Sequence, residues 1–227
     1  MSDAAVVTID GPSGSGKGTI SRALASQVHW HLLDSGALYR LVALAGLEKG
    51  LQPDDISGHA QLATAMEMSF GARPDGGELV TLFGRDVTRD VRSEVAGQGA
   101  SRVAAWPEVR SALLERQRAF RRPPGLVADG RDMGTVVFPA APLKIFLTAS
   151  LAERALRRHK QLKDKGSDVS LPALSREIAE RDLRDSTRKA SPLKAAADAH
   201  VIDSTELTID AVVDRVLALG RDRSLWS

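Results

Sequence analysis

Cysteine is absent from this 227-residue chain, which excludes disulfides, thiolate metal sites and a cysteine nucleophile. Aromatic residues make up only 4% of the sequence, which argues against a protein that stacks single-stranded bases. The formal net charge is only +2, so the chain lacks the strong basic charge typical of nucleic-acid binding. No apolar run approaches the roughly 20 residues of a membrane span, and no basic, apolar leader precedes the first apolar run. We therefore expect a cytoplasmic protein.

A glycine-rich segment near the N-terminus is the most informative part of the sequence. It reads Gly11-Pro12-Ser13-Gly14-Ser15-Gly16-Lys17-Gly18-Thr19 and lies between an apolar run, residues 4–9, and a helical pattern, residues 20–28. Strand, glycine-rich loop and helix is the arrangement of a P-loop, whose backbone N–H groups and helix N-terminus bind a polyphosphate. Lys17 adds a positive charge that reaches the β and γ phosphates. We expect this segment to bind a polyphosphate.

One position departs from the general P-loop pattern. Gly18 follows the lysine where serine or threonine is usual, and the hydroxyl comes one residue later, at Thr19. This Gly-Lys-Gly-Thr ending resembles the nucleoside monophosphate kinases. The resemblance implies that Lys17 and Thr19 hold the donor phosphates, with the Thr19 hydroxyl as a ligand of Mg²⁺.

Short apolar runs recur along the chain, and helical periodicity fills much of the space between them. Five runs read as buried strands, at residues 6–9, 30–33, 126–128, 144–147 and 200–202. Their alternation with helices predicts an α/β fold of the P-loop NTPase type, with a parallel five-stranded sheet covered by helices. Ligands bind at the carboxyl ends of such strands. Acidic residues follow four of the runs, and of these we expect Asp203 to be only a turn or cap.

Residues 66–91 break this alternation. Residues 67–70, 78–83 and 85–88 read as short strands separated by turns at residues 72–77 and at Gly84. We expect a small antiparallel insert in the α/β frame.

Two segments have the form of further phosphate or metal sites. Residues 32–40 repeat the strand–turn–helix arrangement, with Ser35 at the start of a helix and Arg40 about one turn inside it. A second phosphate site is one interpretation; an N-cap serine and a solvent-facing arginine are the other. Residues 126–135 place Asp129 at the end of a strand, where its carboxylate meets Mg²⁺ through water, as in a Walker B element. Arg131 beside it offers a planar fork to phosphate oxygens, although a plain turn is the alternative.

A cationic region follows, at residues 151–165 and 176–188. Arg181, Asp185 and Arg188 are spaced by four and three residues, so they share one face of a helix. We expect part of this charge to be a solvated surface. A few of the arginines should instead neutralise the charge of a phosphoryl group in transfer.

Residues 32–40, 128–139 and 180–185 resemble the bacterial cytidylate kinases, and the similarity extends from the P-loop to Thr205. This resemblance implies ATP-dependent phosphorylation of CMP and dCMP by direct in-line transfer, with Mg²⁺ as cofactor. It implies a core P-loop domain, residues 1–30 and 104–220, with a short lid at about residues 154–170. It also implies an acceptor-binding region, residues 31–103, that carries the antiparallel insert.

The same resemblance assigns roles to individual residues. Cytosine carries an amino donor beside acceptor atoms, which suits a carboxylate at Asp132 and the donors Arg110 and Ser101. The residues expected to bind the acceptor phosphate are Ser35, Arg40, Arg131 and Arg188. The sugar hydroxyls are assigned to Arg181 and Asp185, and the lid over the donor to Arg157 and Arg158. The expected catalytic residues are Lys17, Asp129, Arg131 and Arg188.

Other functions stay open from the residues alone. A P-loop does not name its acceptor, so another small-acceptor kinase, of the UMP or shikimate type, is the nearest alternative. A regulatory GTPase would need an Asn-Lys-x-Asp motif, which does not occur. A nucleic-acid-binding module that uses residues 154–165 conflicts with the near-neutral charge and few aromatics. We expect a monomer whose partners are ATP, CMP and dCMP, and neither nucleic acid nor a membrane.

Overall fold

The computed structural model describes residues 4–75, 77–164, 166 and 169–226. The chain divides into two compact units. The core unit contains the residues up to Asp34 and those from Arg118 onward, and the inserted unit is Ser35–Gln117. Both boundaries expected from the sequence, after residues 30 and 103, lie earlier in the chain. The strand at residues 31–34 belongs to the core unit because it pairs with a core strand.

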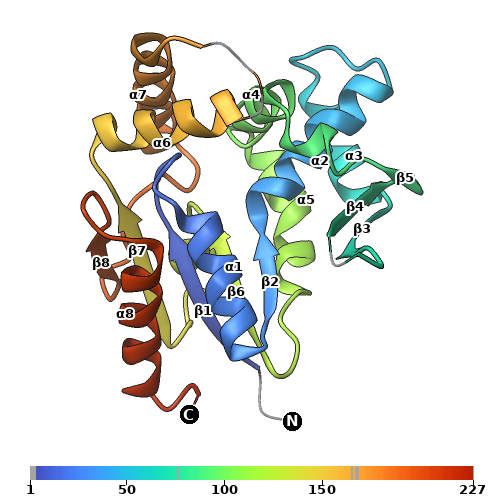
Figure 1. Ribbon diagram of the computed structural model, residues 1–227. Helices are drawn as coiled ribbons and strands as arrows, with labels where there is room; N and C mark the ends of the chain where they lie inside the picture. Colours follow the sequence, from blue (N-terminus) through green and yellow to red (C-terminus); the bar gives the residue numbers. More distant parts are fainter. Residues whose placement is uncertain (1–3, 76, 165, 167–168, 227) are drawn as a thin grey trace. The chain divides into compact units, whose positions relative to one another are not determined.

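Five parallel strands form the sheet of the core unit, in the order β2-β6-β1-β7-β8 (Figure 1). They are β1 (Ala5–Asp10), β2 (His31–Asp34), β6 (Gly125–Gly130), β7 (Leu143–Thr148) and β8 (His200–Asp203). Each contains or overlaps an apolar run identified in the sequence, so the predicted parallel five-stranded sheet is confirmed. The central strands β1 and β6 are buried almost throughout, which explains their continuous apolar sequence.

Helices α1 (Lys17–Val28) and α8 (Ile209–Arg221) lie together along one face of this sheet (Figure 1). Their apolar stripes, which include Leu24 and Val216, pack against sheet residues such as Ile9 in one buried cluster. Helices α6 (Leu151–Asp164) and α7 (Leu171–Thr187) lie beyond the carboxyl ends of the strands. The cationic residues 151–164 therefore form a helix near the edge where ligands bind. Lys165 and part of the expected lid, residues 167–168, lie outside the described residues.

The strand register gathers acidic residues at the carboxyl edge of the core sheet. Asp129 of β6 pairs with Asp34 of β2 on one side and with Ile9 of β1 on the other. Asp10, the last residue of β1, is next in register. Asp203 ends β8 and forms the expected turn, since its Oδ1 accepts hydrogen bonds from the Thr205 N–H and hydroxyl, at 2.9 and 2.5 Å.

The inserted unit combines helices with a small sheet. Strands β3 (Met68–Ala72), β4 (Glu78–Leu82) and β5 (Arg85–Asp86) pair antiparallel, which confirms the predicted insert. Gly76, in one of the predicted turns, lies outside the described residues. The remaining elements are α2 (Ser35–Glu48), α3 (Ile56–Ala65), the 3₁₀ turn η1 (Asp90–Arg92), α4 (Glu94–Val103) and α5 (Pro107–Arg118). In neither unit, over the residues described, is any helix both long and apolar enough to cross a bilayer.

The start of β6 gives a test of the packing. A Cβ built on Gly125 would lie 2.3 Å from Cδ2 of Trp30, and the Trp30 ring is held edge-to-face against Trp226 with centroids 5.3 Å apart. We expect Gly125→Ala to lower the free energy of unfolding by about 1–3 kcal/mol, because it overpacks this contact. Urea denaturation measures the change. Gly71→Ala in β3 is the matched control, since no atom lies within 4 Å of its built Cβ; equal losses in both variants would contradict the packing argument.

Candidate active site

The glycine-rich segment forms a tight loop between β1 and α1. Gly14 and Gly16 have φ angles of 78° and 90°, in the left-handed region that residues with a side chain rarely adopt. The Gly16 carbonyl accepts the Thr19 and Ile20 N–H groups at 3.0 and 3.1 Å, so α1 begins at Lys17. The helical pattern in the sequence begins only at residue 20. Lys17 and Thr19 therefore lie in the first turn of α1.

Several predicted site residues converge on Lys17 within the core unit. The Lys17 Nζ donates a hydrogen bond to the Pro12 carbonyl at 3.0 Å. Desolvation, and next the positive charge of Arg131, lower the pKa of Lys17 to about 7, while Asp129 opposes the shift. Arg181 and Asp185 of α7 act on the same pKa. Residues that are far apart in the sequence thus lie close enough to interact around the loop lysine.

The carboxylate of Asp129 lies against the loop. A Cβ built on Gly18 would lie 3.2 Å from Oδ2 of Asp129, so a larger residue at position 18 would press on this carboxylate. Burial raises the pKa of Asp129 to about 6; Lys17 opposes the rise and Asp34 adds to it. The departure from the general P-loop pattern at position 18 therefore makes room for a buried, partly compensated carboxylate.

Arg131 forms an ion pair with Asp185 of α7, with Nε and Oδ2 2.8 Å apart. Burial alone would raise the pKa of Asp185, but the charges of Arg131, Arg181 and Arg188 and the Arg131 hydrogen bond hold it below its usual value. Arg188 directly follows α7, and its Nε donates to the Ser191 carbonyl at 2.5 Å. Arg131, Arg181, Asp185 and Arg188 thus form one charged cluster in the core unit.

The inserted unit carries four of the remaining predicted acceptor residues, while Asp132 is buried in the core unit directly after Arg131. Ser35 is buried at the start of α2, and Arg40 in the same helix donates from Nη1 to the carbonyls of Val91 and Ser93, at 3.2 and 3.1 Å. Arg110 donates from Nη1 to the Ala104 carbonyl at 3.1 Å. The Ser101 Oγ is buried and has no hydrogen-bond partner in the described part of the chain. A buried polar atom of this kind is suited to a ligand.

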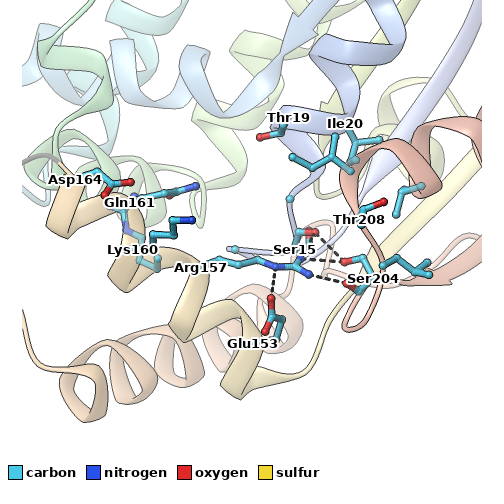
Figure 2. A pocket seen from close by; sticks show the side chains of 16 residues that line it. Ser15, Thr19, Ile20, Glu153, Arg157, Lys160, Gln161, Asp164, Ser204 and Thr208 are labelled. Atoms are coloured by element: carbon cyan, nitrogen blue, oxygen red, sulfur yellow. Dashed lines mark hydrogen bonds and ion pairs between the residues drawn. The ribbon is translucent and has the colours of Figure 1, made fainter.

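A cavity of about 530 Å³ lies beside the P-loop in the core unit (Figure 2). Its walls come from the P-loop and the start of α1, from α6, and from the segment that follows β8. Arg157 of α6 crosses one wall, as Figure 2 shows. Its Nη1 donates to the Ser15 carbonyl at 3.3 Å and its Nη2 to the Ser204 carbonyl at 2.6 Å. Arg158, also predicted from the sequence, lines the same cavity.

Sequence reasoning missed two kinds of residue at this site. The wall after β8 includes Ser204, whose Oγ donates to the Ser15 carbonyl at 3.2 Å, and the apolar residues Leu207, Ile209 and Val212. The second kind is Arg154 of α6, whose side chain is only 7% exposed. It donates to the Ser13 carbonyl at 3.1 Å and pairs with Asp182 of α7 at 2.6 Å.

Arg154 does not belong to the solvated surface that we expected for part of this cationic region. Its guanidinium joins three segments, because it bonds the P-loop, the Ala149 carbonyl directly after β7, and α7 at once. Nothing in the local sequence distinguishes Arg154 from the less buried cations of the same helix, since its partners come from distant segments.

The Arg154 contact gives a second test. Removal of the Asp182 carboxylate leaves a buried guanidinium with carbonyl partners only, so we expect Asp182→Ala to lower the free energy of unfolding by about 1–3 kcal/mol. Glu180→Ala, an exposed position on the same helix, is the control and should change it by less than about 0.5 kcal/mol. Chemical denaturation of both variants measures the difference, and a loss no larger than that of the control would refute the buried pair.

Comparison with known proteins identifies the family. The cytidylate kinase family model matches residues 7–222. The cytidylate kinase of Stutzerimonas stutzeri is 57% identical over 97% of this chain and 96% of its own length. Those of Methylococcus capsulatus and Aeromonas salmonicida are 54% and 56% identical, over 94% and 97% of this chain and 96% and 95% of their own lengths. The chain contains a P-loop and matches these relatives over nearly its whole length. It therefore belongs to the cytidylate kinase family, a group of nucleoside monophosphate kinases.

Proposed function

We propose that the protein transfers the γ-phosphoryl group of ATP to CMP or dCMP and forms ADP with CDP or dCDP. The proposal depends on one observation, the convergence of Arg131 and Asp129 on Lys17 of the P-loop. A phosphoryl group in transfer spreads negative charge over its oxygens, and a preorganised set of cations stabilises that charge. Membership of the cytidylate kinase family supports CMP as the acceptor and makes the UMP and shikimate alternatives less favoured.

The donor ATP is assigned to the P-loop and the adjoining cavity. Its phosphates bind residues 11–19, with Arg157 and Arg158 beside them. The Ser15 Oγ is buried without a partner in the described part of the loop, and a phosphate oxygen would satisfy it. The apolar wall after β8 suits the flat faces of a base.

Mg²⁺ is assigned to Asp129, through water, and to the Thr19 hydroxyl. Over the residues described, no group of three or more His, Cys, Asp and Glu side chains gathers as a metal site. A single carboxylate fits Mg²⁺, which keeps several waters and binds substrate phosphates. A carboxylate whose charge burial penalises also gains from a nearby cation. The ion would neutralise charge on the donor phosphates and orient them.

The acceptor residues keep the roles predicted from the sequence. Asp132 accepts from the cytosine amino group, and Arg110 and Ser101 face its acceptor edge. The acceptor phosphate is assigned to Ser35, Arg40, Arg131 and Arg188, and the sugar hydroxyls to Arg181 and Asp185. Of these residues, the inserted unit contains Ser35, Arg40, Ser101 and Arg110, and the core unit contains the others.

The reaction needs no strong base, because the attacking phosphate oxygen of CMP is already anionic. This oxygen forms a bond to the γ-phosphorus while the bond from the γ-phosphorus to the bridging oxygen breaks, and ADP leaves with that oxygen. Lys17, Arg131 and Arg188 then act by positioning and by charge stabilisation. We also propose a monomer that acts in the cytoplasm, where ATP and CMP are available. Light scattering should then give a mass near 24.3 kDa.

The first test of the function is the lysine of the loop. We expect Lys17→Met to lower kcat by about 10²–10³-fold with the fold intact, because a cation beside the transferred group is lost. ADP formation from ATP–Mg²⁺ is measured with CMP, dCMP, UMP, AMP, GMP and shikimate in turn. Lys194→Met, at an exposed position, is the matched control. Near-normal turnover in Lys17→Met would show that the loop does not stabilise the transferred phosphoryl group. Absence of CMP-dependent turnover in the wild-type protein would exclude the function.

Base recognition is tested at Asp132. A uracil ring presents a carbonyl oxygen where cytosine presents its amino group, so it repels a carboxylate. We expect Asp132→Ala to lower the ratio of kcat/KM for CMP to that for UMP by about 10–100-fold, as the loss of one base contact does. An unchanged preference would remove Asp132 from the base site.

A further inference from the structure

Arg154 of α6 is a buried cation to which the proposed reaction assigns no role. Its side chain is only 7% exposed, and its three nitrogens each bond a partner in a different segment. Nε donates to the Ala149 carbonyl at 3.0 Å, Nη1 donates to the Ser13 carbonyl at 3.1 Å, and Nη2 pairs with Oδ2 of Asp182 at 2.6 Å. Because a guanidinium is planar and rigid, a shift of one partner changes the geometry of the other two contacts.

The contact with Ser13 orients one peptide of the P-loop. In a trans peptide the carbonyl and the next N–H point in opposite directions, so the bond from Arg154 to the Ser13 carbonyl turns the Gly14 N–H toward the other side of the loop. Gly14 has a φ of 78°, and glycine adopts either sign of φ readily, so local sterics alone do not fix this orientation. A P-loop binds phosphate through its backbone N–H groups, so donor binding depends on how this peptide is held.

Asp182 connects the same guanidinium to α7. It directly follows Arg181 and lies one turn before Asp185, the two residues assigned to the sugar hydroxyls of the acceptor. The Asp182 Oδ1 is buried and has no hydrogen-bond partner among the residues described, so the position of this carboxylate depends on Arg154. An acceptor that holds α7 in place therefore also restricts Asp182 and, through it, Arg154. Donor binding then has less conformational freedom left to remove.

We propose that Arg154 is a positioning residue that couples the two substrates: it holds the Ser13–Gly14 peptide in the orientation that binds donor phosphate, and Asp182 strengthens this hold when the acceptor is bound to α7. This inference rests on the proposed function, because the acceptor contacts of α7 belong to that proposal. ATP and CMP should each bind more tightly in the presence of the other, and by the same factor, since a coupling free energy is reciprocal.

The test measures this coupling with CMP and AMP-PNP–Mg²⁺, an ATP analogue whose γ-phosphoryl group is not transferred. Isothermal titration calorimetry gives the Kd of AMP-PNP without and with saturating CMP, and the ratio of the two is the coupling factor. We expect a factor of about 5 or more in the wild type, and titration of CMP without and with AMP-PNP should give the same value.

Asp182→Ala is the informative variant, because Arg154 keeps its bonds to the Ser13 and Ala149 carbonyls. We expect it to lower the coupling factor by about threefold or more, with the Kd of each ligand alone within about twofold of wild type. A merely structural role would not lower the coupling while both single-ligand affinities stay the same. Glu180→Ala, at an exposed position on the same helix, is the matched control and should keep the wild-type factor.

Further variants keep the test independent of stability. If Asp182→Ala does not fold, Asp182→Asn keeps the shape of the side chain, removes its charge and gives the same readout. Arg154→Lys keeps a positive charge without the planar fork, so it should also lower the coupling factor. Asp182→Ala added to Arg154→Lys should cause no further fall, because the two residues act through one contact. Thermal unfolding of each variant confirms that folded protein is measured.

Three results would overturn the inference while the proposed function stands, with CMP-dependent ADP formation by the wild-type protein. The wild type would show no coupling between AMP-PNP and CMP, or Asp182→Ala would keep the wild-type factor with unchanged affinities. In the third result, Asp182→Ala would bind AMP-PNP more weakly with and without CMP at an unchanged factor, which would make the pair a support of the P-loop alone. Wild-type protein without CMP-dependent turnover would overturn both the function and the inference.

Discussion

At the carboxyl edge of the core sheet, ionisable side chains are buried, and burial disfavours their charged forms. The site depends on how far the opposite charges of these side chains offset that cost. Burial raises the pKa of Asp10 to about 7 and of Asp129 to about 6, and desolvation lowers the pKa of Lys17 to about 7. Lys17 and Arg131 offset the cost at Asp129, but Lys17 and Arg131 repel each other. A bound polyphosphate would add negative charge and favour the protonated form of Lys17. Substrate binding would therefore offset the free-energy cost of burying this charge.

Strand order brings these charges together. β6 and β7 follow one another along the chain, yet β1 lies between them in the sheet. Such a position, where successive strands lie on opposite sides of a central strand, is where parallel α/β sheets bind ligands. The loop after β1 leads into α1 at Lys17, Asp129 lies near the end of β6, and Arg131 directly follows β6. Parallel pairing of Ile9 with Asp129 places these two segments side by side. The local sequence of neither segment predicts this pairing.

Features encoded by neighbouring residues were predictable, and features made by distant partners were not. The strands follow from apolar runs, and the P-loop follows from glycines next to a strand, so both were found from the sequence. The start of α1 at Lys17 was missed because hydrophobic periodicity begins only where a helix packs, at Ile20. The sequence around Arg154 resembles that around the less buried cations of α6, and its burial depends on distant partners such as Ser13 and Asp182. The donor-cavity wall after β8 has no motif, only apolar side chains that the fold places beside the loop.

The two arginines predicted for the donor lid differ in their surroundings. Arg157 already donates from Nε to Glu153 at 2.8 Å, from Nη1 to Ser15 and Ser204, and from Nη2 to the Ser204 carbonyl. Contact with a phosphate would have to replace some of these bonds, so the net gain is reduced by what is lost. Arg158 lines the same cavity, and desolvation lowers its pKa, with Glu177 acting against the shift. A partly desolvated guanidinium gains more from an approaching anion than a hydrated one does. On these grounds we expect Arg157 to serve first as a wall between the P-loop and the segment after β8.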